Sequence, residues 1–257
     1  MKRRHGAAGG QDIAGEQGSK KSRWWRRLSQ SWLGIGLLAL LLAGAGYWVL
    51  AGVEPQRFSE EHLEALLLDK AEAGEAYARL AYAPDFSGLI SDRTFVAVAF
   101  DDRDAAEELD AIIEHDRIRG MAEAYALETA TPGTSGPVYL FSQIDLYRLA
   151  EGASAHFREI AARPLHVGET SRHGVSVIEA ERFSTSGIGD EASGSVGVTS
   201  YEAGTLGKVI VYTTTITFRR GQVISYVGVD RADPSNIREE VSNLARILDA
   251  RLAAEQK

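Results

Sequence analysis

The most prominent feature of the hydrophobic pattern is one uninterrupted apolar run at residues 32–53, which contains no charged side chain. As an α-helix, a run of this length would extend about 33 Å and could cross the ~30 Å hydrocarbon core of a bilayer. Residues 1–31 are polar and basic and have no apolar period, so they are expected to be disordered. The pattern therefore predicts a disordered tail at 1–31 and a transmembrane helix at 32–53.

Beyond this run, apolar positions follow helical spacing in some segments and strand-like spacing in others. Helices are expected over residues 60–81, 101–115, 149–161 and 234–252, of which the first is a juxtamembrane helix or helix pair. Strands are expected over residues 94–100, 117–128, 138–147, 174–183, 196–201, 209–218 and 223–229. Ser59 is expected to cap the first helix and Asp233 the last, with Pro234 at the first helical position.

Two expected hairpins, each followed by an amphipathic helix, decide the fold class. In the second hairpin, Arg220-Gly221 has the form of a two-residue connection with glycine where a positive φ is required. Because consecutive hairpins pair their strands antiparallel, the sequence predicts an α+β fold in which helices cover a mainly antiparallel sheet. The hairpin–helix unit would be weakly duplicated. The expected parts after the span are a juxtamembrane helical segment at 54–84 and an extracytoplasmic α+β domain at 85–257.

The charge distribution gives the predicted span a direction. Residues 1–31 carry eight Lys/Arg and two acidic residues, a net charge of +6, whereas residues 54–257 carry 20 basic and 34 acidic residues, a net charge of −14. Basic residues next to a span stay on the cytoplasmic side, so the N-terminus should be cytoplasmic and the C-terminal domain extracytoplasmic, in a single-pass cell-membrane protein. The residues expected at the two membrane interfaces are Arg23, Trp24, Trp25, Arg26, Arg27 and Trp32 on one side, and Tyr47 and Trp48 on the other.

A cleaved signal peptide is the alternative to this signal-anchor. Leu37–Leu42 resembles an apolar signal region, and Ala43-Gly44-Ala45 has the small-x-small form of a cleavage site after Ala45. The apolar run continues through Val53, however, and the segment before it is long for a signal peptide. These two features favour the uncleaved anchor, which makes the lipid bilayer a partner of the chain.

Composition excludes several kinds of chemistry. The absence of cysteine excludes disulfides, thiol catalysis and cysteine-ligated zinc. The acidic domain argues against nucleic acid, because phosphate repulsion would have to be overcome. None of the six histidines stands in a recognised metal-binding spacing, so neither a metal nor a cofactor is expected. The stretch 187–192 partly matches a dinucleotide-binding pattern but lies in a Gly/Ser-rich loop, where a tight turn is the better interpretation.

Three short stretches resemble a pattern found in exported or membrane-anchored bacterial proteins. They are Gly187-Ile188-Gly189-Asp190-Glu191-Ala192, Thr217-Phe218-Arg219-Arg220-Gly221-Gln222-Val223, and Leu248-Asp249-Ala250-Arg251-Leu252 in the last helix. The corresponding domains are similar to the Mog1/PsbP-like α/β/α sandwich. The resemblance covers roughly residues 85–254 and is densest in the last 70. It implies a fold class and brings no established catalytic residues.

The candidate ligand-binding residues lie in the glycine-rich loop and in the last hairpin. Asp190 and Glu191 belong to the loop, while Arg219, Arg220 and Arg231 could together grip an anionic ligand. No catalytic motif accompanies them. The sequence therefore favours a non-catalytic binding or interaction domain whose partner is another extracytoplasmic protein or a small ligand.

Two other functions remain open from the sequence. The first is a membrane-tethered hydrolase that combines His166 or His173 with Asp190 or Glu191, and it requires an imidazole within hydrogen-bond reach of a carboxylate. The second is a carrier for a lipid or another small apolar ligand, and it requires a cavity between the sheet and the helices.

Overall fold

The structure, a computed structural model, describes residues 58–92, 102–128, 134–170, 175–202, 208–235 and 237–256. The predicted tail at 1–31, the predicted span at 32–53 and the predicted strand at 94–100 lie outside these residues. Among the described helices, none combines the length and the apolar character that crossing a bilayer requires.

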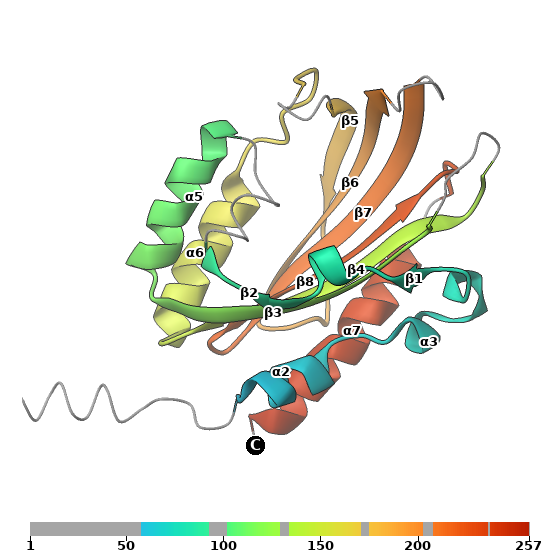
Figure 1. The fold of residues 1–257 in the computed structure, drawn as a ribbon. Helices are drawn as coiled ribbons and strands as arrows, with labels where there is room; N and C mark the ends of the chain where they lie inside the picture. Colours follow the sequence, from blue (N-terminus) through green and yellow to red (C-terminus); the bar gives the residue numbers. More distant parts are fainter. Residues whose placement is uncertain are drawn as a thin grey trace, which may run out of the picture. The chain divides into compact units, whose positions relative to one another are not determined.

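A strongly bent antiparallel sheet forms the centre of the described part (Figure 1). Its strands are β1 Ala81–Tyr82, β2 Gly88–Ile90, β3 Arg117–Ala126, β4 Pro137–Tyr147, β5 Ser176–Phe183, β6 Glu191–Glu202, β7 Lys208–Arg220 and β8 Val223–Arg231. They lie in the order β1-β3-β4-β8-β7-β6-β5, and β2 also pairs with β3. All of these pairs are antiparallel, so the predicted antiparallel sheet is confirmed.

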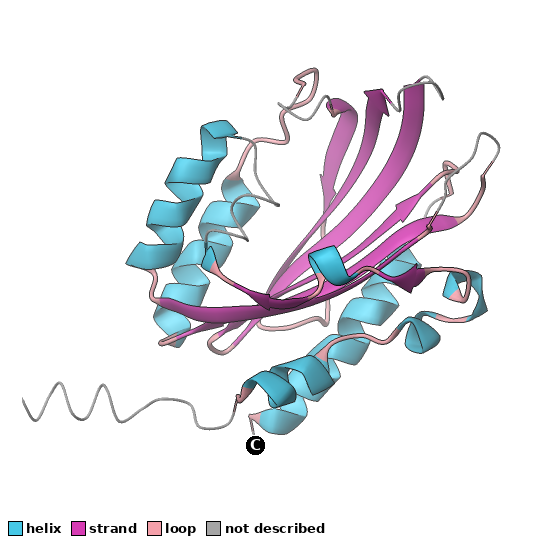
Figure 2. Ribbon diagram, viewed as in Figure 1, coloured by secondary structure: helices cyan, strands magenta, loops and turns pink. Residues whose placement is uncertain are grey.

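Helices cover both faces of the sheet, which gives three layers (Figure 2). The helices are α2 Glu60–Leu66, α3 Lys70–Ala73, α5 Asp102–Glu114, α6 Ala150–Ala162 and α7 Arg238–Glu255, with short 3-10 turns at Glu75–Tyr77 and Pro84–Phe86. α2 and α7 lie on one face, and α5 and α6 lie on the other (Figure 1). The α+β class with helices covering the sheet is therefore confirmed.

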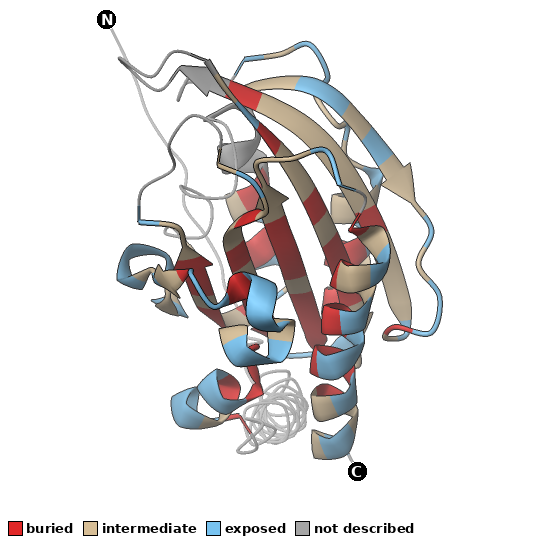
Figure 3. Cartoon of the chain, turned by 90° about the vertical axis from the view of Figure 1, so that its right-hand side faces the viewer, coloured by how far each residue is buried: buried red, intermediate tan, exposed pale blue. Residues whose placement is uncertain are grey.

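The main core lies between the sheet and the α2/α7 layer. Successive side chains of a strand point to opposite faces, so Val223, Val227 and Val229 of β8 pack toward α7, whereas Ile224 packs toward α6. The C-terminal helix presents its buried residues to the sheet and its exposed residues to solvent (Figure 3). Its buried stripe consists of Val241, Leu244, Ala245, Leu248 and Leu252.

The first described segment packs into the same core. Leu63 and Leu66 of α2 are buried in the cluster that contains the α7 stripe. Arg251 of α7 donates to the carbonyl oxygens of Leu66 at 3.1 Å and Leu67 at 2.6 Å. The described part of the predicted juxtamembrane segment is thus built into the folded unit, while the predicted domain boundaries stay a prediction.

The predicted N-terminal cap of the first helix is correct, whereas the predicted cap of the last helix is wrong. Ser59 caps α2 by accepting from the His62 amide at 3.2 Å. Asp233, in contrast, does not cap α7, which begins at Arg238. The Asp233 carboxylate instead accepts from the side chain of Arg231 and from the backbone amides of Gly136 and Ser235, so the chain turns here before the helix starts.

Two further details of the strands differ from expectation. Arg220 pairs with Val223, so the hairpin loop is Gly221-Gln222, one position later than predicted, with Gly221 at φ +56°. β6 begins at Glu191 instead of Val196. The Phe183 ring lies over Gly194 so closely that a Cβ there would come within 2.4 Å of it, so this glycine suits a strand with a ring packed against it.

The two hairpin–helix units are adjacent in the sheet, because β4 pairs with β8. The helix after β4, which is α6, and the helix after β8, which is α7, nevertheless pack on opposite faces. The predicted duplication is therefore limited to the order of the elements along the chain.

Candidate functional site

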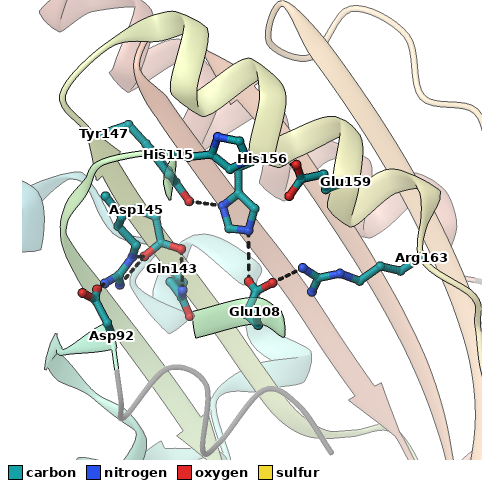
Figure 4. A network of polar contacts seen from close by, with 10 residues as sticks. Asp92, Glu108, His115, Gln143, Asp145, Tyr147, His156, Glu159 and Arg163 are labelled. Atoms are coloured by element: carbon teal, nitrogen blue, oxygen red, sulfur yellow. Dashed lines mark hydrogen bonds and ion pairs between the residues drawn. The ribbon is translucent and has the colours of Figure 1, made fainter. Parts of the chain in front are cut away.

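Titratable side chains gather on the sheet face beneath α5 and α6. Gln143, Asp145 and Tyr147 occupy alternate positions of β4 and therefore point to this face, while Ile144 and Leu146 between them enter the main core. Side chains from both helices meet this row (Figure 4). We call the resulting set the buried network: Asp92, Glu108, His115, Arg117, Gln143, Asp145, Tyr147, His156, Glu159 and Arg163.

Arg117 and Asp145 form one half of the buried network. The Arg117 guanidinium donates to Asp145 Oδ1 from Nε at 3.0 Å and from Nη2 at 2.6 Å, and it also pairs with Asp92. Gln143 donates to the second Asp145 oxygen at 2.8 Å. A Cβ on Gly120 would lie 2.1 Å from the guanidinium and 2.3 Å from the carboxylate, so only glycine leaves room for this pair.

His156 lies at the centre of the other half. Its Nδ1 is 2.5 Å from the Tyr147 hydroxyl, and its Nε2 is 3.1 Å from Glu108 Oε1. The other Glu108 oxygen accepts from Arg163, at the end of α6. The His115 ring stacks on His156 with ring centroids 5.7 Å apart. Because Glu108 belongs to α5, His156 to α6 and Tyr147 to β4, these contacts join both helices to the sheet.

Burial determines the protonation states in the buried network. It lowers the pKa of His156 to about 4, so the imidazole is neutral near pH 7. It also raises the pKa of Tyr147 well above its usual value. A neutral His156 that donates from Nε2 to Glu108 can accept a hydrogen bond from the Tyr147 hydroxyl at Nδ1. At Arg117, burial opposes the charge, but the nearby Asp145 carboxylate raises the pKa.

This arrangement resembles a proton relay but lacks access to a substrate. Glu108, Tyr147, Asp145 and His156 are each 0% exposed. A group that acts as a general base must come within hydrogen-bond reach of its substrate. As described, the buried network can hold two helices on a sheet and fix their orientation, and its four central residues are closed to solvent.

The same face of the sheet, beneath α5 and α6, also carries the carboxyl group of Asp230 in β8. Burial raises its pKa to about 6, against the lowering effect of a hydrogen bond from Thr213. Asp230→Asn removes a charge that is unfavourable in the folded state. We expect it to raise the free energy of unfolding by about 1–2 kcal/mol above pH 6, which allows for the partial exposure of the residue.

The gain from Asp230→Asn should shrink to a small fraction as the pH falls from 6 toward 4, where the wild-type carboxyl is protonated in the folded state and partly protonated in the unfolded state. Urea unfolding of both proteins at pH 8 and pH 4 measures this. The exposed Asp110→Asn serves as the matched control. A gain of equal size at both pH values would contradict the assigned cause.

Four of the five candidate ligand-binding residues come together at the β7–β8 turn. Arg219 pairs with Glu191 at 2.7 Å and with Asp190 at 3.1 Å. Arg220 pairs with Asp249 of α7 and lies 4.0 Å from Asp190. Register explains this gathering, because Glu191 at the start of β6 lies opposite Arg219. These arginines are engaged by carboxylates of the chain itself, and their ligand role stays a prediction.

Arg231 does not join this cluster. It lies at the far end of β8, where it pairs with Asp233 at 3.1 Å. The nine residues of β8 separate it from the hairpin turn by about 26 Å at the usual rise of a strand. The expectation that the three arginines cluster at one end of the hairpin is therefore wrong for Arg231.

The loop before β6 packs closely on the same turn. Gly189 has φ +57°, and a Cβ there would lie 2.4 Å from the carbonyl oxygen of Arg219. Gly187 has φ +69° but nothing within 4 Å of its Cβ position. Gly187→Ala should therefore cost about 1 kcal/mol from backbone strain alone, and Gly189→Ala about 2 kcal/mol because a steric conflict is added.

The two glycine variants are compared by urea unfolding under identical conditions, with each serving as the control for the other. Equal losses of stability would show that backbone conformation alone makes glycine necessary at position 189.

The residues of the predicted hydrolase site are engaged elsewhere. The His166 imidazole lies 3.4 Å from Glu169, three residues further along the chain. Asp190 and Glu191 are held by the arginine cluster described above. His173 lies outside the described residues. In the described part, neither loop carboxylate is paired with His166.

The described surface contains an open groove on the α7 side of the sheet, with a volume of about 480 Å³. Strands β5, β6 and β7 form its floor, and Pro234, Ser235 and Arg238 form one wall. Its volume lies within the usual range of small-molecule sites. We call it the β5–β7 groove.

Sequence reasoning missed the buried network entirely. Two signals point to it in retrospect. Asp145 interrupts an apolar strand, and His156 falls between Ala153 and Phe157 on the apolar stripe of its helix. Polar residues at positions that read as core must find partners when they are buried.

Comparison with known proteins identifies a similar solved structure. No family model matches the chain, and no curated protein matches it. Among solved structures, the chain is similar to the extracellular domain of PknH from Mycobacterium tuberculosis. The sequence identity is 12%, the TM-score is 0.47, and the match covers 77% of this chain and 98% of that one.

Proposed function

We propose that this chain is a single-pass membrane protein that presents a non-catalytic binding domain on the extracytoplasmic side. The apolar run at 32–53 and the net charges of +6 before it and −14 after it support the anchor and its direction. A similarity of the domain to the Mog1/PsbP-like sandwich is part of the same proposal, supported by three layers around an antiparallel sheet.

One observation carries the choice of a binding domain over an enzyme. The described cluster in which an imidazole joins a hydroxyl and a carboxylate is fully buried, whereas the β5–β7 groove is open and contains no histidine in its lining. The imidazole–hydroxyl–carboxylate cluster therefore does not line the groove. An accessible groove without such a cluster suits recognition of a ligand better than its conversion.

Native mass spectrometry of the full chain, purified in detergent from its membrane fraction, tests the binding function. The expected result is a retained ligand or partner with defined stoichiometry. Turnover of ester, peptide or glycoside substrates would favour the hydrolase, especially if Glu191→Gln abolished it while Glu151→Gln did not. A retained lipid in the domain would instead favour the carrier.

Topology is tested separately with reporters fused to the C-terminus. We expect alkaline phosphatase to be active there and green fluorescent protein to be dark, because phosphatase requires export and the fluorescent protein folds poorly after it. The reverse pattern would overturn the orientation. The same fusions run on a gel show whether the chain is shortened after Ala45.

A further inference from the structure

The floor of the β5–β7 groove is built from two rows of side chains that cross three strands. Glu181 of β5, Val196 of β6 and Thr214 of β7 lie opposite one another in the first row. The second row consists of Glu179, Val198 and Tyr212. Each row therefore begins with a carboxylate on the edge strand β5, continues with a valine on β6 and ends with a hydroxyl-bearing residue on β7.

The inner end of the first row carries a hydroxyl side chain that lines the groove. Thr214 is 5% exposed and lines the groove. A hydroxyl group can both donate and accept a hydrogen bond, so the Thr214 side chain can pair with either kind of polar group on a ligand. The groove thus offers a directed polar contact at its floor.

The outer end of the groove carries uncompensated negative charge. Glu179 is exposed and has no cationic partner among the described residues, whereas Glu181 pairs with Arg238 at 3.0 Å. Arg238 is also held by Phe183, whose ring centroid lies 5.0 Å from the guanidinium carbon. The three charged side chains of the lining therefore carry a net charge of −1, in a domain of net charge −14 that attracts cations over a distance.

We propose that the β5–β7 groove binds a small organic cation with an ammonium or guanidinium group. Glu179 takes the charged group, and the Tyr212 ring offers its face to the same cation. The valines contact the aliphatic part of the ligand, and Thr214 hydrogen-bonds a polar group on it. This inference rests on the proposed binding function and names the chemistry of its ligand.

Isothermal titration of the full chain in detergent, at low ionic strength, tests the proposal. The probes are spermidine, agmatine and the capped peptide acetyl-Gly-Lys-Gly-amide, with 1,4-butanediol as the uncharged comparison. We expect at least one cation to bind with 1:1 stoichiometry, the diol to show no heat of binding, and the affinity to fall as salt is added. Tighter binding of the peptide identifies a lysine side chain as the source, and tighter binding of a free amine identifies a metabolite.

Three variants locate the site. Glu179→Gln should weaken cation binding at least tenfold, because it removes the charge but keeps the shape. Thr214→Val should weaken it about threefold, through the lost hydrogen bond. Glu151→Gln, which changes an exposed carboxylate at the start of α6 on the opposite face, should leave the affinity unchanged. Circular dichroism confirms that each variant is folded.

Each outcome decides the inference. Absence of binding by all three cations, or an equal affinity in Glu179→Gln, overturns it. If native mass spectrometry then finds a neutral or anionic ligand, the inference fails while the binding function stands. If no probe binds and no ligand is retained, both fail.

Discussion

Replacement of Arg117 by methionine is expected to lower the free energy of unfolding by about 3–5 kcal/mol. The change removes the cationic partner of Asp145, which is 0% exposed, and leaves Gln143 as its remaining described side-chain donor. Removing one member of a buried ion pair is costly because the other charge keeps its desolvation penalty and loses its partner. Circular dichroism during urea unfolding is the suitable measurement, because the four tryptophans lie in the first 48 residues and do not report on the sheet.

Two companion variants distinguish the stability effect of breaking the buried ion pair from the effect of losing a positive charge on β3. Arg119→Met removes the same positive charge two residues further along the strand, where the side chain is partly exposed, and should change stability by less than about 1 kcal/mol. The double variant Arg117→Met with Asp145→Leu should recover most of the loss, because it removes both charges. A double variant as unstable as Arg117→Met would refute the electrostatic explanation.

Stability should fall by about 3 kcal/mol between pH 6.5 and pH 4 through the titration of His156 alone. In the unfolded chain this imidazole takes up a proton near pH 6.5, whereas burial keeps it neutral in the folded chain down to about pH 4. The unfolded state therefore binds more protons in this window, so acid favours unfolding. The stabilising contribution is fully present above pH 6.5 and decreases as the pH falls toward 4.

The His156 contribution is isolated by comparing wild type with His156→Gln at each pH, because the titration of carboxyls such as Asp230 is common to both. His156→Gln should be less stable at pH 7, and the difference should shrink by about 3 kcal/mol at pH 4. His62→Gln, at a partly exposed imidazole that pairs with Glu255 at 3.0 Å, is the comparison variant outside the buried network. A difference that stays constant with pH would show that His156 does not change its charge state on unfolding.

The sequence pattern predicts the α+β class well because the class depends on local signals. The alternation in β7 and β8, the glycine at 221 and the leucine stripe of α7 each lie within a few residues of one another. Exact boundaries were less predictable. Asp233 looks like a helix cap, but its carboxylate is engaged by Gly136, which is 97 positions away in the chain.

In the candidate site, too, features that depend on nearby residues were predicted, and features that depend on residues distant in the chain were not. Asp190 was expected in the glycine-rich loop and Arg219 in the last hairpin, and the pairing of β6 with β7 brings them together. Arg231 was misplaced because the length of β8 carries it to the opposite end of the strand. The buried network was missed because Arg117 and Asp145 are separated by 28 positions, and only the register of β3 against β4 makes them neighbours.

The contact between α2 and α7 has a consequence for the order of events during synthesis. The leucines of α2 leave the ribosome well before the helix that covers them, Arg238–Glu255. Arg251, which holds the Leu66 and Leu67 carbonyls, follows them in the chain by 185 and 184 positions. This face of the sheet therefore closes only after α7 has been synthesised, and a truncation before α7 leaves the leucines of α2 without their cover.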